Sequence, residues 1–288
     1  MNGSEDIVRC HGITKDPETN DFMMVMRYIE NGSLRQHLNN NFNSFDWKSK
    51  LLHLYRISVG LKNIHESKLI HQDFHCGNIL CDDKYSYITD LGLCKPVNVK
   101  PSQSGNKNIY GVLPYVAPEV LRGKEYTQAS DIYGFGIIAY EICTGLPPYH
   151  DIAHDEFLAA KICQGLRSNS NYKIPQLISD IIKQCWDADP LKRPNAEELR
   201  KLLSDLDDDA NDEDCDTYDE NYIINKQIKE ADEINKQISA STALSSSTSI
   251  LSYTTHPQAV YTSRLLDFKN LPEPKNAEDD FLEDYSGN

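Results

Sequence analysis

Three short motifs between residues 71 and 119 contain the side chains whose types and spacing could do chemistry. They are His71-Gln-Asp73-Phe-His-Cys-Gly-Asn78, Asp90-Leu-Gly92 and Ala117-Pro-Glu119. Each motif alone is weak, since a lone Asp-x-Gly usually marks a turn and Ala-Pro-Glu arises by chance in many proteins. All three in this order, around a pair of expected strands, are much harder to obtain by accident. The carboxylates and the amide of this set therefore form the candidate site.

The histidines of the first motif suggest a different chemistry, because His71 and His75 stand four residues apart, as in the zinc-binding helix H-E-x-x-H. The glutamate of that motif is missing, and Gly77 would break a helix at this point. The eight cysteines of the chain are scattered and form no C-x-x-C pair. We therefore do not expect a zinc site.

The order and spacing of the three motifs resemble those of the eukaryotic protein kinase family, H-R-D-L-x-x-x-N, D-F-G and A-P-E. The resemblance implies that Asp73 accepts or orients the proton of a substrate hydroxyl. It also implies that Asn78 and Asp90 hold Mg²⁺ against the phosphates of ATP, since a hard ion takes oxygen ligands. These three residues are the expected catalytic residues. The implied cofactors are ATP and Mg²⁺, and the implied partner is a protein substrate.

The resemblance covers residues 5–204 and also implies an adenine site. Met26 occupies the gatekeeper position, and Tyr28 lies in the hinge whose backbone meets the adenine ring. Leu80 would form the floor under the base. Ordinary core packing would explain Met26 and Leu80 equally well.

Two structural roles follow from the same resemblance. Asp131 resembles the aspartate that ties the catalytic loop to a central helix. Arg193 resembles the arginine that pairs with the Glu119 position. Neither residue is expected to touch the reacting groups.

Several positions depart from the family pattern. Gln72 replaces the arginine that normally receives a phosphorylated activation loop, and an amide has no charge for such a contact. His75 stands where Ser/Thr kinases usually have lysine, and Leu91 replaces the phenylalanine of D-F-G. Residues 111–119 look like those of the tyrosine-kinase-like group, which mostly phosphorylates Ser and Thr. The first motif is also similar to that of some fungal members of the group.

The sequence upstream of residue 71 contains no G-x-G-x-x-G and no Val-Ala-x-Lys. We therefore expect a small lobe that is truncated at its N-terminal side, with impaired positioning of ATP phosphates. Two hypotheses remain: a protein kinase weakened by this absence, and a non-catalytic, kinase-like scaffold that acts by binding proteins. The three intact catalytic positions favour the first hypothesis, and the missing loop and lysine favour the second for this chain.

The elements that must position the candidate site can be read from hydrophobic periodicity. Residues 7–14 and 22–29 predict two strands, and 79–81 and 85–88 a hairpin. Ser33 is a plausible cap for a short helix to Leu38. Longer helices are expected at 47–66, 130–145, 154–164, 175–186 and 196–204. The expected fold class is α+β: a kinase-like fold with a mostly helical large lobe and only the last strands of the small lobe.

Charge divides the 288-residue chain, whose formal net charge is −15. Residues 1–204 carry a net charge of −1, and residues 205–288 carry −14. We therefore expect a small-lobe remnant and hinge at 1–30, a large lobe at 31–204 and a tail at 205–288. The acidity argues against nucleic-acid binding, which needs clustered Lys and Arg.

The tail is expected to be largely disordered, because its first part is acidic and residues 239–255 are rich in Ser and Thr. Ile224-Asn-Lys-Gln-Ile228 recurs as Ile234-Asn-Lys-Gln-Ile238. This repeat allows a short amphipathic helix, either marginal within a disordered tail or docked on the body or a partner.

No signal peptide and no membrane-spanning run is visible, and the scattered cysteines suit free thiols in a reducing compartment. We therefore expect a cytoplasmic protein.

Overall fold

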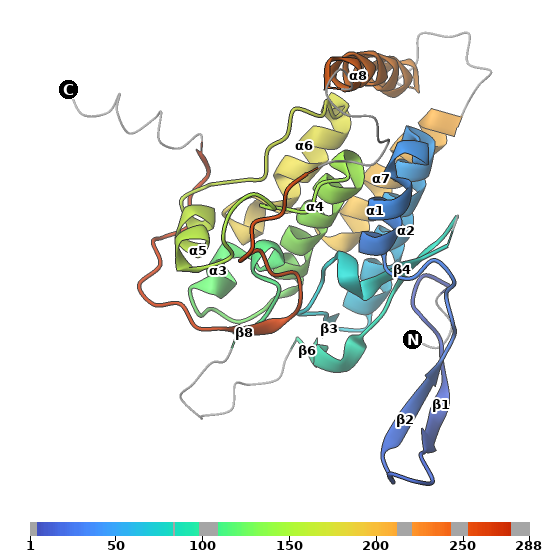
Figure 1. Ribbon diagram of the computed structural model, residues 1–288, viewed down its shortest axis with the longest axis vertical. Helices are drawn as coiled ribbons and strands as arrows, with labels where there is room; N and C mark the ends of the chain where they lie inside the picture. The colour runs from blue at the N-terminus through green and yellow to red at the C-terminus, as the bar shows by residue number, and fades with distance from the viewer. Residues whose placement is uncertain (1–4, 83, 98–108, 212–220, 243–252, 278–288) are drawn as a thin grey trace.

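The computed structural model describes residues 5–82, 84–97, 109–211, 221–242 and 253–277. It consists of a helical lobe from which one β-hairpin projects (Figure 1). This arrangement confirms the expected mixed α and β architecture, in which the helices predominate. The boundaries of the expected segments 1–30, 31–204 and 205–288 stay a prediction.

The projecting hairpin consists of β1 (Cys10–Lys15) and β2 (Phe22–Met26), paired antiparallel with an irregularity between Cys10 and Gly12. Its turn is stabilised by Asp16, whose carboxylate accepts the backbone N–H of Glu18 at 2.7 Å. Apolar side chains on both faces of the hairpin lie in solvent, and that of Phe22 is 79% exposed. The two predicted strands are confirmed, and no described element covers them.

The base of the hairpin is anchored to the lobe through a few backbone contacts. Val8 N–H donates to the carbonyl of Ile88 at 2.9 Å, and Ile88 N–H donates to the carbonyl of Asp6 at 2.9 Å. Val8, Ile29 and Tyr87 form a small apolar cluster against which Leu80 packs. The hairpin is thus fixed at its base.

Two helices follow the hairpin. Ser33 caps α1 (Leu34–Asn41) through a capping box with Gln36, as the sequence predicts for the helix start. Asp46 accepts the N–H of Ser49 and caps α2 (Trp47–Glu66), whose apolar stripe enters the main core. Both expected helices are present.

Helix α4 (Gln128–Thr144) is the centre of the lobe, because almost all of its residues are buried. It begins at a capping box between Thr127 and Ser130 and ends at Gly145, which adopts a left-handed conformation with φ 71°. Helices α2 and α6 (Gln176–Cys185) pack against it, whereas α7 (Ala196–Asn211) packs on α2, and α3 (Pro118–Leu121) packs on α5 (Glu156–Cys163).

Short antiparallel strand pairs connect the helices. They are β3 (Leu69–Ile70) with β6 (Lys95–Pro96), β4 (Ile79–Cys81) with β5 (Ser86–Ile88), and β7 (Ile109–Gly111) with β8 (Arg264–Leu266). The pair β4–β5 is the expected hairpin. The pair β7–β8 joins segments that are more than 150 residues apart in sequence, and the sequence does not indicate it.

Within residues 205–288 the structure describes 205–211, 221–242 and 253–277, and the expected disorder of this tail stays a prediction. Helix α7 continues to Asn211, and α8 (Asn221–Thr242) lies across the ends of α6 and α7 (Figure 1). Ile224 of the repeated motif is buried, and Asp232 accepts a hydrogen bond from the Trp47 indole at 3.0 Å. The repeat therefore forms a helix docked on the body. Residues 212–220 and most of the Ser/Thr-rich stretch lie outside the described residues.

The seven cysteines within the described ranges are free thiols, five of them buried. Among the helices that the structure describes, none combines the length and the apolar character needed to cross a membrane.

A buried histidine in the core gives the fold a predictable response to acid. Burial, with a smaller contribution from His37, lowers the pKa of His53 from 6.5 to about 4. The unfolded chain therefore binds a proton between pH 6.5 and 4 that the folded chain does not. As the pH falls across that window, we expect this histidine alone to lower the free energy of unfolding by about 1.4 kcal/mol per pH unit.

Urea denaturation at a series of pH values measures this effect. His53→Gln should reduce the decrease in the free energy of unfolding below pH 6.5. His11→Gln, which replaces an exposed imidazole, should leave that decrease unchanged. Parallel curves for the wild type and His53→Gln would contradict the prediction.

Candidate functional site

The loop of residues 71–78 is held in place by Asp131 of α4. The carboxylate of Asp131 accepts the backbone N–H of His71 at 2.8 Å and that of Gln72 at 3.1 Å. It also forms a hydrogen bond of 2.9 Å with Nε2 of the His65 ring. Gln72 adopts a left-handed backbone with φ 72°, a conformation that costs a non-glycine residue about 1 kcal/mol. The buried carboxylate thus fixes the backbone just before Asp73.

Asp73 is 6% exposed and has several polar partners. The Asn78 amide donates to the carbonyl of Asp73 at 2.9 Å and to its carboxylate at 3.2 Å. His75 Nε2 lies 3.5 Å from the same carboxylate, and the Ser263 hydroxyl donates to it. Burial alone would raise the pKa of Asp73, but the hydrogen bonds from His75 and Ser263 and the charge of His75 outweigh it and lower the pKa. The carboxylate is therefore an ionised acceptor at neutral pH.

His71 serves the loop as a neutral ring. Burial, partly opposed by the charge of Asp131, lowers the pKa of His71. Its Nε2 lies 3.1 Å from the carbonyl of Thr89, and its Nδ1 accepts the N–H of Asp73 at 3.3 Å. The ring therefore links the loop to the residue before Asp90.

The β4–β5 hairpin brings Asn78 and Asp90 to the same end of one strand pair. Ile79 and Ile88 are register partners, and Thr89 N–H donates to the carbonyl of Asn78 at 3.0 Å. Asp90 is exposed and adopts a left-handed backbone with φ 55°. Strained residues of this kind occur often at functional sites.

The donors at this end of the hairpin fit a magnesium ion. The Asn78 nitrogen faces Asp73, which turns the amide oxygen away from Asp73. That oxygen and the Asp90 carboxylate are hard ligands of the type that Mg²⁺ takes when water and phosphate fill its other positions. In the described ranges, no group of three or more His, Cys, Asp or Glu is arranged to hold a metal ion.

The three residues expected at an adenine site lie where the projecting hairpin meets the lobe. Met26 ends β2 and is partly exposed, Tyr28 is 83% exposed, and Leu80 on β4 is half-buried. Arg27 contacts the lobe here, with its guanidinium 4.8 Å from the centre of the Tyr87 ring. These positions stay a prediction.

Two ion pairs with buried carboxylates lie within the lobe. Arg193 binds Glu119 with two hydrogen bonds of 2.8 Å, in the pairing expected from the sequence. Arg35 binds Glu141 at 2.7 Å, and the Tyr115 hydroxyl donates to the same carboxylate. The second pair was not predicted. Its signal in the sequence is an acid within the apolar stretch 135–142, because a buried carboxylate needs a cationic partner.

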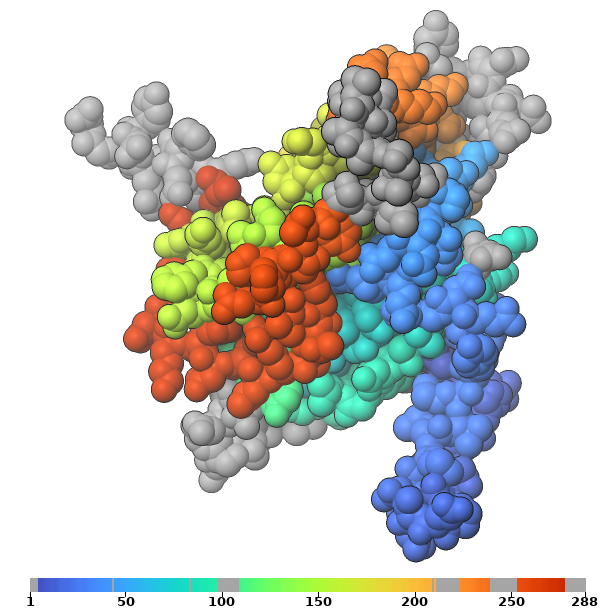
Figure 2. Space-filling model, in the orientation of Figure 1, coloured from blue at the N-terminus to red at the C-terminus, as the bar shows by residue number. Residues whose placement is uncertain are grey.

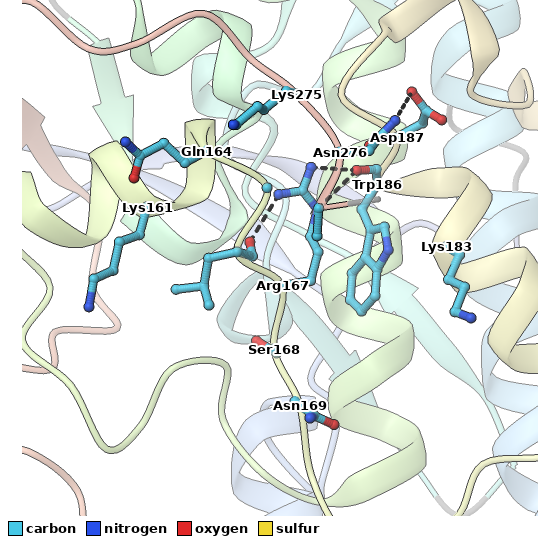
Figure 3. Close-up of a pocket in the computed structure, with 13 residues that line it drawn as sticks. Lys161, Gln164, Arg167, Ser168, Asn169, Lys183, Trp186, Asp187, Lys275 and Asn276 are labelled. Carbon is cyan, nitrogen blue, oxygen red and sulfur yellow. Dashed lines mark hydrogen bonds between the residues drawn. The ribbon is translucent and has the colours of Figure 1, made fainter. Parts of the chain in front are cut away.

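A hollow of ≈ 1010 Å³ lies away from this loop (Figure 3). Arg167 crosses it and donates to the carbonyls of Trp186 and Ile162. It contains none of the residues expected to be catalytic or to bind a cofactor. The polar groups at Asp73, Asn78 and Asp90 define the candidate site better than cavity size does.

Residues 2–203 match the model of a family described as protein tyrosine and serine/threonine kinase. The chain is 34% identical over 213 residues, 68% of its length, to a probable serine/threonine-protein kinase roco5 of Dictyostelium discoideum. It is 28% identical over 211 residues, 62% of its length, to a protein kinase and PP2C-like domain-containing protein of Arabidopsis thaliana. It is 29% identical over 197 residues, 65% of its length, to a tyrosine-protein kinase SPK-1 of Girardia tigrina. These matches span 7%, 32% and 39% of the respective relatives.

Proposed function

The chain belongs to the protein tyrosine and serine/threonine kinase family, and from that premise we propose that it transfers a phosphoryl group from Mg-ATP to Ser or Thr hydroxyls of proteins. Members of this family use ATP and Mg²⁺. The proposal assigns Asp73 to the acceptor hydroxyl, and Asn78 and Asp90 to the metal.

The observation that carries the proposal is the contact between Asp73 and a serine hydroxyl. The ionised carboxylate, held by Asn78 and His75, accepts a hydrogen bond from the Ser263 side chain. A group that orients a hydroxyl in this way can also take its proton. A tyrosine ring at the same backbone position would carry its hydroxyl past the carboxylate. This geometry favours Ser or Thr as the acceptor.

The metal site and the adenine site complete the proposal. Bound Mg²⁺ would neutralise charge on the phosphate oxygens. Asn78 and Asp90 would hold it, and Leu80 would lie under the adenine between Met26 and the hinge at Tyr28. The proposal also places the chain in the tyrosine-kinase-like group, with a first motif similar to that of some fungal members.

We further propose that transfer by this chain alone is weak. Its sequence contains no G-x-G-x-x-G and no Val-Ala-x-Lys, the elements that hold the ATP phosphates in related enzymes. The contacts of Asp131 with the loop and of Asn78 with Asp73 support the proposal that positioning of the acceptor is nevertheless retained.

Radiolabelled ATP with Mg²⁺ and a Ser-containing protein substrate tests the function. Asp73→Asn should lower the rate by about 10²–10⁴-fold, because the acceptor hydroxyl loses its base. Asp90→Asn should lower it to background, because the metal loses its carboxylate ligand. Asp180→Asn, which changes an exposed carboxylate on α6, should leave the rate unchanged.

Transfer that survives both Asp73→Asn and Asp90→Asn would contradict the assignment. Wild-type chain without any transfer would instead favour the non-catalytic scaffold, whose binding partners would then be sought by its surface and its C-terminal residues.

A further inference from the structure

Residues 253–277, here called the C-terminal strap, cross the face of the lobe on which Asp73 lies. Figure 2 shows most of them as an orange-red band beside the green and yellow-green helices. The strap is tied down at both ends. The Tyr253 hydroxyl donates to the Asn39 amide oxygen at 3.1 Å, and Asn276 accepts the N–H of Ala188 at 3.0 Å.

The middle of the strap adds a strand to the segment that leads into residues 112–119. Leu266 pairs with Ile109, and Arg264 pairs with Gly111, in an antiparallel register. A side chain at Gly111 would crowd this place, since a Cβ would lie 2.9 Å from Val116 Cγ2 and 3.9 Å from Asp73 Oδ1. Addition of an extended segment to a strand edge is a common mode of peptide recognition.

The register of this strand places a serine at the candidate catalytic carboxylate. Ser263 immediately precedes β8, and its hydroxyl donates to Asp73. The next residue, Arg264, donates to the carbonyl of His154. The strap therefore presents to the site a hydroxyl on an extended backbone.

Side chains on both sides of Ser263 anchor the strap. Before it, the Tyr261 ring lies 4.4 Å below the Arg35 guanidinium, and its hydroxyl donates to the carbonyl of Pro148 at 3.0 Å. After it, Leu266 is 3% exposed and joins the main core, while its neighbour Leu265 is 48% exposed. This alternation is that of a strand with one buried face.

The last part of the strap follows α3 and α5. Arg122 donates to the carbonyl of Leu271 at 3.2 Å and forms an ion pair with Glu273. Lys275 N–H donates to the carbonyl of Cys163 at 3.0 Å. The exposed Glu273 pair contributes little, so the main anchors are Tyr261 and Leu266.

We propose that the face formed by β7, Asp73 and the Arg35–His154 region is the protein-substrate site, and that the strap occupies it in cis with Ser263 in the place of the acceptor hydroxyl. This inference rests on the proposed function, because it assigns Asp73 to the acceptor. It deepens that function in two ways. The substrate class is an extended segment in which a serine immediately precedes a strand. The residue after the serine is basic, and the residue three positions after the serine is apolar. The strap also regulates the site, because other substrates must displace it.

A tethered segment competes strongly, because its effective concentration is of the order of millimolar. A free peptide of the same sequence can therefore bind only to the fraction of molecules in which the strap has left the site. Release of the strap should raise the apparent affinity for that peptide.

Fluorescence anisotropy with a fluorescein-labelled synthetic peptide of residues 256–271 tests the proposal on the full-length chain without ATP. Leu266→Asp places a charge in the core and should release the strap. Ser263→Glu should also release it, since a second carboxylate would face Asp73, and it leaves the core intact. Both variants should bind the peptide about tenfold or more tightly than the wild type. Leu265→Asp, the same change on the exposed face, should bind it like the wild type.

Hydrogen exchange at the amides of Ile109 and Gly111 provides the second measurement. Exchange should rise in Ser263→Glu and fall again when the peptide is added. Equal peptide binding by the wild type and the released variants, or no binding by Ser263→Glu, would overturn the proposal. Since no ATP is present, a failed phosphoryl-transfer assay and a failed binding test are separate results.

Discussion

Replacing Asp131 with alanine is expected to lower the free energy of unfolding by about 3–5 kcal/mol, because three donors converge on this buried carboxylate. Asp131 is 2% exposed, so the N–H groups of His71 and Gln72 would lose a buried, charged acceptor. The loop before Asp73 would lose this charged anchor on α4. We therefore expect phosphoryl transfer to fall together with stability.

Urea denaturation gives the stability, and hydrogen exchange at His71 and Gln72 localises the effect. Asp155→Ala is the matched control, because Asp155 caps α5 through the N–H groups of Phe157 and Leu158, and its removal should cost about 1 kcal/mol. If both variants lost the same small amount and the loop amides stayed protected, Asp131 would not be the anchor of the loop.

Replacing Arg193 with methionine is expected to lower the free energy of unfolding by about 3–5 kcal/mol, because Glu119 would be left buried without its cation. The same guanidinium also donates to the carbonyls of Asp187 and Ala129, at 2.8 and 2.9 Å, and it lies 5.3 Å from the centre of the Tyr133 ring. Those acceptors would lose their donor as well. The change is measured by chemical denaturation with the slope checked against the wild type.

The exposed pair Arg200–Glu197 on α7 provides the control for Arg193. Its atoms are 3.0 Å apart, but both side chains reach solvent, so Arg200→Ala should cost about 0–1 kcal/mol. The double variant Glu119→Gln/Arg193→Met should recover part of the loss, because no uncompensated charge remains. Similar losses for Arg193→Met and Arg200→Ala would show that the buried pair is dispensable.

Local patterns in the sequence predicted most of the lobe. Capping residues such as Ser33 and the apolar stripe of residues 47–66 depend on neighbours within a few positions, and the helices begin and end close to where they were expected. The pairing of Arg193 with Glu119 and the support from Asp131 were found through the family resemblance, since the partners are far apart in the sequence.

Long-range contacts explain what was not predicted. Lys50 is an example: it is buried, lies over the rings of Phe42 and Trp47 at 4.2 and 4.5 Å, and donates to the carbonyl of Cys143. The strap has no strong periodicity of its own, and its strand is only three residues long. Its position depends on the surface that receives it, which composition cannot reveal.

The docked α8 and the strap have a practical optical consequence, because the chain contains two tryptophans and each lies beside one of these elements. The Trp47 indole donates to Asp232 of α8, and Trp186 is followed by Asp187, whose carboxylate accepts the Asn276 amide at 3.3 Å. In Trp186→Phe, Trp47 is the remaining tryptophan, and its emission wavelength would report the environment of α8. In Trp47→Phe, the emission wavelength of Trp186 would report the environment at the end of the strap. Ordinary ultraviolet fluorescence can thus distinguish the departure of either element without a label.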